Sequence, residues 1–196
     1  MVPVRLETRT LLHELLHEGG PARVAEIGVF KGEYARYLLD VVCAHPDSEL
    51  HLIDPWAPGP VVSGDADGND VVSYDGRDLF EVVVREFAYD PRVRIHRGYS
   101  HQVIPSFPDA HFDLVYIDGD HSYEGVARDL ELAHACVREG GWIMGHDYEM
   151  NSEKARHLYD FGVKRAVGEY CAARRQRVAA LAMDGCVSFA IQKTST

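Results

Sequence analysis

The sequence has few basic residues and no long hydrophobic run. Its 196 residues include 20 Lys and Arg against 31 Asp and Glu, which gives a formal net charge of −11. Because nucleic-acid affinity comes mainly from basic side chains that neutralise phosphates, this charge argues against a nucleic-acid partner. No apolar stretch approaches the ~20 residues that cross a bilayer, so we expect no membrane partner. Arg5, Glu7 and Arg9 make the N-terminus unlike a secretory signal, and we expect a cytoplasmic protein.

Cysteine is also scarce, and its spacing forms no recognisable metal-binding or redox motif. The chain has four cysteines and no C-x-x-C pair: Cys43, Cys136, Cys171 and Cys186. We expect reduced thiols in the core, the alternative being a structural zinc or a disulfide pair. With 46% hydrophobic and 26% charged residues, the chain has the composition of a globular protein. Its length suits one ordinary domain.

Segments with strand and helix periodicity alternate along the chain. The strands are expected at 23–27, 49–54, 93–96, 112–117 and 142–145, and the helices at 33–44, 78–89, 123–138 and 153–174. An Asp184-Gly185 pair between the apolar runs 178–183 and 187–191 predicts a terminal hairpin. The alternation predicts an α/β fold with a single doubly wound, Rossmann-like sheet. We expect this sheet to be seven-stranded and mostly parallel, with a C-terminal antiparallel hairpin.

Two segments lie outside this alternation. Leucines at helical spacing predict a helix over Leu6–Glu18, so that residues 1–21 form an N-terminal helical element and residues 22–196 form the domain. This helix could cover the pocket or serve a homodimer contact. Pro55 to Asp75 is rich in Pro, Gly and Asp and has no periodicity. A long unstructured loop is often functional, so we expect a mobile lid over the site, the alternative being a surface insertion.

The ends of the expected strands carry the candidate ligand-binding residues, because doubly wound sheets bind ligands there. Glu26, Gly28 and Gly32 form an E-x-G-x-x-x-G turn whose glycines allow a sharp bend and a close approach to a ligand. The spacing differs from the G-x-G-x-x-G of nicotinamide enzymes, and Glu26 suits an ammonium group better than a pyrophosphate. Asp54 could accept ribose hydroxyls. Gly98-Tyr99-Ser100 could meet an adenine ring.

The turn at residues 26–32, Asp54 and Gly98-Tyr99-Ser100 follow one another along the chain. In this order they resemble the corresponding segments of class I S-adenosylmethionine-dependent methyltransferases. Within that class, Phe112–Val126 and Gly140–Tyr148 are similar to a small bacterial group related to macrocin-type sugar O-methyltransferases and cephalosporin-biosynthesis proteins. The resemblance covers about Ala22 to Lys193. It implies an enzyme that transfers a methyl group from S-adenosylmethionine to a hydroxyl of a small secondary metabolite, as in antibiotic biosynthesis.

The resemblance also implies a map of the binding site. The donor would be held by Glu26, Gly28, Gly32, Asp54, Tyr99, Ser100 and Asp118. A divalent ion, Mg²⁺ or Mn²⁺, would be held by Asp118, His146 and Asp147. Neighbouring parallel strands lie ~5 Å apart, so residues that end both can converge on one ion. The His146 imidazole suits Mn²⁺ better than Mg²⁺, which leaves the ion and the need for one open.

The residues at the acceptor side allow two alternatives. The proton-removing group would be Asp120 or His121, and histidine is favoured because it titrates near neutral pH. Tyr34 and Lys164 could contact the acceptor, and Lys164 could pair with an anionic one. The alternative function is therefore a metal-independent methyltransferase that esterifies a phosphonate or carboxylate oxygen.

Overall fold

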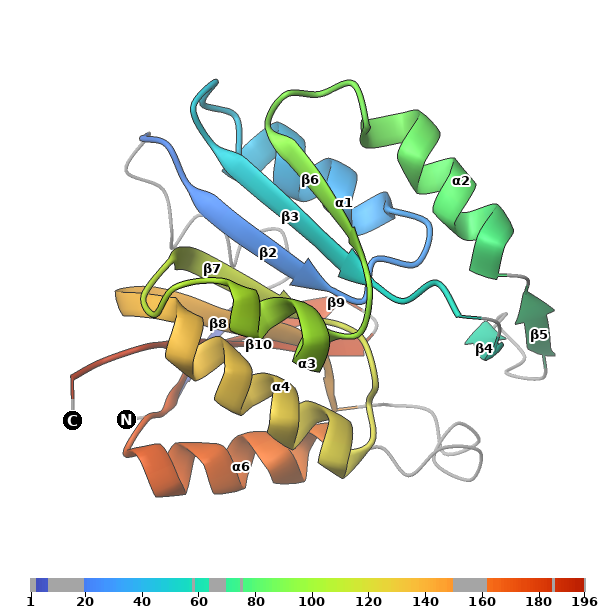
Figure 1. Cartoon of the computed structure of the whole chain (residues 1–196). Coiled ribbons are helices and arrows are strands. Elements are labelled where there is room, and N and C mark those ends of the chain that lie inside the picture. Colours follow the sequence, from blue (N-terminus) through green and yellow to red (C-terminus); the bar gives the residue numbers. More distant parts are fainter. Residues whose placement is uncertain are drawn as a thin grey trace.

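Figure 1 shows the computed structural model of the chain, which describes residues 3–6, 20–57, 59–63, 70–74, 76–149, 162–184 and 186–195. The strands of the main sheet are β1 (Val4–Leu6), β2 (Arg23–Ile27), β3 (Glu49–Asp54), β6 (Val93–Arg97), β7 (Phe112–Ile117), β8 (Val137–Glu149), β9 (Val178–Asp184) and β10 (Cys186–Gln192). The helices are α1 (Glu33–Tyr37), η2 (Leu38–Val42), α2 (Gly76–Phe87), α3 (Ser100–Val103), η3 (Ile104–Ser106), α4 (Tyr123–Cys136) and α6 (Val163–Arg174). None of the described helices combines the length and apolar character that a membrane crossing requires.

The main sheet has eight strands in the order β1-β9-β10-β8-β7-β2-β3-β6. β2 pairs in parallel with both β3 and β7, so the chain builds outward to β6 on one side and then returns to the other side. β10 is antiparallel to β9, as the Asp184-Gly185 pair predicts, and it is also antiparallel to β8. The strand order reverses between β2 and β7, which makes their carboxyl ends the expected ligand-binding crevice.

Apolar side chains cover both faces of the sheet, and the helices lie on both sides of it (Figure 1). On one face, α1, η2 and α2 bury side chains such as Leu38 and Phe87 against the sheet. On the other face, α4 and α6 bury Leu130 and Val167. A parallel strand covered on both faces is apolar at nearly every position, which explains the buried pattern along β7.

The N-terminal prediction is wrong at its first residue. Leu6 was expected to begin a helix, but Val4–Leu6 forms β1, which pairs in parallel with β9 and makes the sheet eight-stranded rather than seven-stranded. A three-residue strand is too short to show a periodic pattern in the sequence. Its pairing partner, β9, also lies far along the chain, so no local turn signal marks it. The rest of the predicted helix falls on residues 7–19, outside the described residues.

The segment after β3 also differs from the prediction of an unstructured lid. It contains β4 (Gly59–Ser63) and β5 (Asp70–Tyr74), an antiparallel pair that forms a second, two-stranded sheet. The hairpin lies beyond the carboxyl end of β3, beside the start of α2 (Figure 1). Cross-strand backbone pairing supplies hydrogen bonds to a segment whose composition alone predicts a loop.

Several element boundaries also differ from the expectations. The helix expected over 33–44 is α-helical only to Tyr37 and continues as the π-helix η2. The strand expected at 142–145 extends over Val137–Glu149. α6 begins at Val163, and the part of the expected helix before Gly162 lies outside the described residues. All four cysteines are free thiols, and burial raises the pKa of Cys43 and Cys136 to about 12.

A half-buried ion pair between Asp90 and Arg92 stabilises the turn that leads into β6. Arg92 donates from Nε and Nη2 to the two carboxylate oxygens of Asp90, at 2.9 and 2.7 Å. Arg92 Nη1 also donates to the carbonyl oxygen of Cys43 at 2.7 Å, which ties this loop to the end of η2. The hydrogen bond from Arg92 lowers the pKa of Asp90 to about 2.

We therefore expect Asp90→Asn to destabilise the protein in a pH-dependent way. Because the folded pKa lies below the unfolded value, the carboxylate stabilises the fold above about pH 4, and this contribution disappears as the pH falls toward about 2. The difference in unfolding free energy should be ~1–2 kcal/mol near neutral pH and should shrink in acid. Urea denaturation at both pH values measures it, with the exposed Asp109→Asn as control. A difference that does not change with pH would contradict the role of this ion pair.

Candidate active site

The turn after β2 packs directly against the end of β7. Gly28 has a φ of +85°, and a Cβ added to it would lie 2.2 Å from the carbonyl oxygen of Asp118. The Asp118 amide donates to the carbonyl oxygen of Ile27 in β2 at 2.8 Å, which holds the same junction, and the Gly28 amide donates to the carbonyl oxygen of Ile53 in β3 at 2.9 Å. Only glycine combines this left-handed conformation with such a close approach. The turn and Asp118 therefore form one continuous surface at the crevice.

Asp54 holds the glycine turn in place. Its Oδ2 accepts hydrogen bonds from the amides of Val29 and Phe30 at 2.9 and 3.1 Å, and its Oδ1 accepts one from the amide of Trp56 at 2.6 Å. Trp56 is 1% exposed, and its Nε1 donates to the carbonyl oxygen of Phe30 at 3.0 Å. Since a carboxylate offers about four acceptor positions, these three amides leave roughly one for a further donor such as a ribose hydroxyl.

Two carboxylates and two imidazoles meet at the ends of β7 and β8. His121 Nε2 lies 3.2 Å from Asp118 Oδ1 and 3.4 Å from Asp147 Oδ2. His146 Nδ1 lies 3.7 Å from Asp118 Oδ1 and 3.3 Å from Asp147 Oδ1. The parallel register pairs Ile117 with Gly145, which places Asp118 beside His146 as the sequence predicts. We call these four residues the carboxylate–imidazole cluster.

The charges of this cluster stabilise one another. Burial lowers the pKa of His121, but its hydrogen bond with Asp118 and the charges of Asp118 and Asp147 outweigh burial and raise it. Burial raises the pKa of Asp147, but the hydrogen bond with His146 and the charges of both histidines outweigh it and lower the pKa. Asp147 also has a φ of 54°, a conformation that costs free energy for a residue with a side chain. Such strain is common where a side chain must point into a site.

The cluster contains the three residues expected as metal ligands, Asp118, His146 and Asp147, and it also brings His121 to the same carboxylates. Asp118, His121 and Asp147 each offer a ligand atom, and these atoms lie within 4.8 Å of one another. His121, expected as a base, therefore lies among the candidate ligands, and His146 lies next to them. Carboxylate and imidazole donors together suit Mn²⁺ or Fe²⁺.

Asp120 does not join the cluster. Its Oδ1 accepts a hydrogen bond from the amide of Ser122 at 3.0 Å, at the start of α4. Its carboxylate also packs over Gly125, where an added Cβ would lie 2.4 Å from Asp120 Cγ. The side chain is exposed and serves the first turn of the helix. Of the two expected proton acceptors, the structure brings only His121 to the carboxylates.

The residues expected near the adenine and the acceptor have structural partners. Ser100 is buried and donates to Asp129 Oδ1 at 2.5 Å, while Tyr99 is 49% exposed and stacks with His101. Tyr34 is 7% exposed, and its ring lies 4.1 Å from that of Tyr116, so it belongs to the core.

The remaining expected donor-binding residues, Glu26 and Gly32, are the first and last residues of the glycine turn. Glu26 is 1% exposed and lies level with Leu52 and Tyr116 in the strand register. Gly32 caps α1 with a φ of +84°, and an added Cβ would lie 2.6 Å from the Phe87 ring. Both residues thus shape the base of the turn.

Three supporting residues were not predicted from sequence. Trp56 clamps the glycine turn, and Asp129 accepts the Ser100 hydroxyl from α4. Gly162 donates to the carbonyl oxygen of His121 at 2.9 Å, and an added Cβ would lie 2.2 Å from Tyr123 Cα. The only signal in the sequence was a glycine inside the helix expected over 153–174, where glycine is unfavourable.

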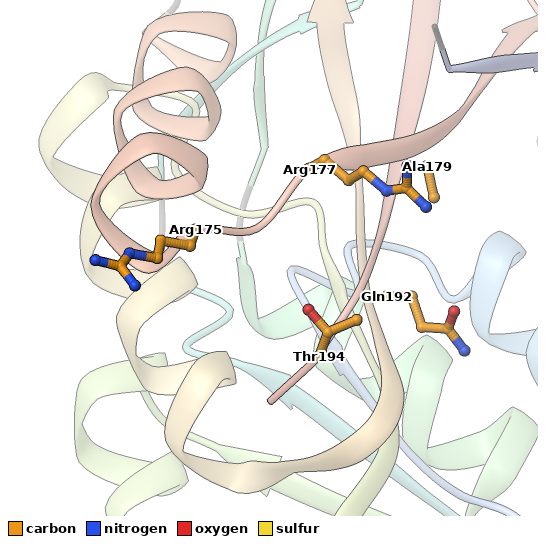
Figure 2. Close-up of a pocket in the computed structure, with 5 residues that line it drawn as sticks. All are labelled: Arg175, Arg177, Ala179, Gln192 and Thr194. Carbon is orange, nitrogen blue, oxygen red and sulfur yellow. The ribbon is translucent and has the colours of Figure 1, made fainter. Parts of the chain in front are cut away.

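A hollow elsewhere on the surface is separate from this site. It is lined by Arg175, Arg177, Ala179, Gln192 and Thr194, between the end of α6 and strands β9 and β10 (Figure 2). Gln192 pairs with Trp142 near the start of β8, whereas Val187 pairs with Glu149 at its end. The hollow therefore lies at the end of the sheet opposite the carboxylate–imidazole cluster.

Comparison with known families identifies the class of protein. Residues 25–148 match the family model described as a methyltransferase domain, which is more than half of the chain. A 66-residue stretch is 29% identical to an uncharacterised protein of Acanthamoeba polyphaga mimivirus, and it covers 34% of this chain and 26% of that protein. The match thus spans about a quarter of the length of that relative.

Solved structures share the fold at low sequence identity. The O-methyltransferase TomG of Streptomyces achromogenes, crystallised with S-adenosylmethionine, is 17% identical with a TM-score of 0.62, covering 95% of this chain and 79% of TomG. A Staphylococcus aureus protein named as a caffeoyl-CoA O-methyltransferase is 12% identical with a TM-score of 0.62, covering 93% and 81%. Spermidine synthase of Thermotoga maritima is 17% identical with a TM-score of 0.58, covering 96% and 61%.

The fold is thus shared with solved methyltransferase structures. The chain belongs to the family of S-adenosylmethionine-dependent methyltransferase domains, and it is an enzyme of that family.

We expect Gly28→Ala to disrupt the junction between β2 and β7. The added methyl group would overlap the Asp118 carbonyl, and the backbone would keep a strained left-handed conformation. The unfolding free energy should fall by about 3 kcal/mol or more.

Gly168→Ala is the matched control. Gly168 lies in α6, and no atom of the described residues lies within 4 Å of an added Cβ, so the same change should stabilise the protein by ~0.5–1 kcal/mol. Chemical denaturation of both variants measures the contrast. Equal stabilities would contradict the close packing at Gly28.

Proposed function

We propose that the protein transfers a methyl group from S-adenosylmethionine to a hydroxyl oxygen of a small secondary metabolite, with the help of a divalent metal. In this reaction the acceptor oxygen forms a bond to the methyl carbon as the bond from that carbon to sulfur breaks. The acceptor loses its proton, and the sulfonium becomes a neutral thioether.

One observation carries the proposal: the glycine turn touches the carboxylate–imidazole cluster. Gly28 packs against the backbone of Asp118, whose side chain begins the cluster. A donor bound over the turn would thus have proton-accepting groups beside its methyl group. Holding two reactants in such proximity can account for much of the acceleration of a displacement reaction. Asp54 supports this arrangement because it fixes the turn before the donor arrives.

His121 is the proposed proton acceptor. Its Nε2 lies near both Asp118 and Asp147, which orient the ring and stabilise its protonated form. A base needs a group that compensates the charge it gains, and the two carboxylates supply it. Asp120 is occupied at the start of α4 and is not needed for this role.

Asp118, Asp147 and His146 would hold the metal, so that His121 serves as the base. When bound, such an ion would make a hydroxyl held beside it more acidic.

The acceptor side favours a neutral hydroxyl over an anionic oxygen. Lys164, the residue expected to pair with an anion, forms an ion pair with Glu149 and lies 5.8 Å from the centre of the Tyr148 ring. Its charge is thus already balanced within the protein. The names of TomG and of the Staphylococcus aureus protein, both O-methyltransferases, support an oxygen acceptor.

His121→Ala should lower kcat by ~100- to 10,000-fold, because it removes the proposed base. Asp120→Asn should change kcat by less than ~10-fold, because asparagine also accepts hydrogen bonds at a helix start. The assay incubates the enzyme with S-adenosylmethionine and a panel of hydroxylated metabolites, and mass spectrometry detects S-adenosylhomocysteine and the methylated product. Donor affinity, measured by calorimetry, should remain in both variants. A larger loss in Asp120→Asn would contradict the assignment.

Chelation should abolish turnover, and Mn²⁺ or Mg²⁺ should restore it in the wild-type enzyme. Asp118→Asn should need more metal for the same restoration, since it removes a charged ligand. Turnover that persists in chelator, with a phosphonate or carboxylate acceptor preferred, would contradict the metal-assisted proposal and favour the alternative function.

A further inference from the structure

A second cluster of potential ligands lies at the opposite end of the sheet. Glu49 begins β3, His51 follows two residues later, and His111 directly precedes β7. One ligand atom from each lies within 4.8 Å of the others. His111 precedes β7 and Asp118 follows it, and a strand rises ~3.3 Å per residue. The two clusters are thus separated along the strand by roughly 20 Å, and the second is no part of the proposed methyl-transfer site.

The position of His51 is the unusual feature of this cluster. It is 7% exposed, and the rings of Phe107 and Phe112 contact it edge-on, at 4.9 and 5.4 Å between ring centres. Its Nδ1 lies 3.0 Å from Nε2 of His96. Its other nitrogen, Nε2, is buried and has no hydrogen-bond partner among the residues that the structure describes. That atom faces Glu49, 3.8 Å from Oε2.

A buried nitrogen without a partner is costly, and a bound ligand can satisfy it. When the Nδ1–H of His51 donates to His96, Nε2 carries a lone pair directed toward the Glu49 carboxylate. Two electron-rich groups that face each other call for a cation between them. Transition metals bind histidine through such a lone pair of the neutral imidazole.

We propose that Glu49, His51 and His111 form a binding site for a divalent transition metal of the zinc type. Two imidazoles and one carboxylate are a common zinc donor set, with metal–ligand distances of ~2.0–2.2 Å. Ligand atoms around such an ion lie ~3.5 Å apart, so small rotations of the half-buried Glu49 and His111 side chains would close the site. Mg²⁺ is disfavoured because imidazole is a poor ligand for it.

His96 completes the site without binding the ion. A ligating histidine normally uses its second ring nitrogen in a hydrogen bond that fixes the orientation of the ring. The contact of His51 with His96 does this. Arg23 lies 3.6 Å from Glu49 Oε2 and limits the negative charge of the site. The ion would connect β3 to the loop that precedes β7.

The test measures zinc uptake in a protein whose carboxylate–imidazole cluster is disabled. Asp118→Asn with Asp147→Asn removes both carboxylates of that cluster, so that zinc bound by this protein reports the second site. Equilibrium dialysis against Zn²⁺, followed by elemental analysis, should find about one zinc per chain. Adding His111→Gln or Glu49→Gln should remove it, and the exposed His101→Gln should not. Circular dichroism verifies that each variant is folded.

Two results would overturn the proposal: no zinc in the double variant, or equal uptake after His111→Gln and Glu49→Gln. If the double variant does not fold, the wild-type protein is compared with His111→Gln alone. A loss of one zinc equivalent then supports the site, and unchanged uptake contradicts it. Neither readout depends on methyl transfer. The test of the zinc site is therefore independent of the proposed function.

Discussion

The contact between Gly28 and the backbone of Asp118 is the constraint on which the site depends. It joins the carboxyl ends of β2 and β7, the two strands between which the strand order reverses. Doubly wound sheets have a ligand-binding crevice at such a point. Here the backbones of the two strand ends approach so closely that only glycine can occupy position 28. The turn that would carry the donor and the first residue of the carboxylate–imidazole cluster are therefore parts of one rigid junction. Their relative position is fixed by the sheet rather than by side-chain flexibility.

Asp54 shows how one side chain can serve both the fold and the site. The sequence predicts that it holds a ribose. In the structure its oxygens also accept hydrogen bonds from three backbone amides, two in the glycine turn and one at Trp56. These charge-assisted bonds preorganise the turn, which lowers the entropy that donor binding must offset. The same logic applies to His121, whose ring is held by two carboxylates and whose carbonyl is held by Gly162. The residues proposed for the donor site and for the base thus have little freedom to move.

The central strands and their terminal acids could be predicted because both follow from local patterns. The strands at 23–27, 49–54 and 112–117 agree with the structure at both ends, since apolar runs between turn signals define buried parallel strands. β1 and the β4–β5 hairpin could not be found, because their hydrogen bonds come from pairing rather than from side-chain pattern. Asp120 and Ser100 were placed in the site by their position after strands. In the structure, Asp120 accepts a hydrogen bond at the start of α4, and Ser100 donates one to Asp129, 29 residues away. The spacing of residues along the sequence does not reveal such partners.

A single structure can test whether the donor binds over the Gly28 turn with its sulfur facing the carboxylate–imidazole cluster. The measurement is a crystal structure of the protein with S-adenosylhomocysteine and Mn²⁺, whose anomalous signal locates the ion. The account predicts the ribose beside Asp54, the sulfur on the side of Asp118, and a manganese peak within coordination distance of Asp118 and Asp147. A ligand at the other end of the sheet, or a sulfur directed away from these carboxylates, would contradict it.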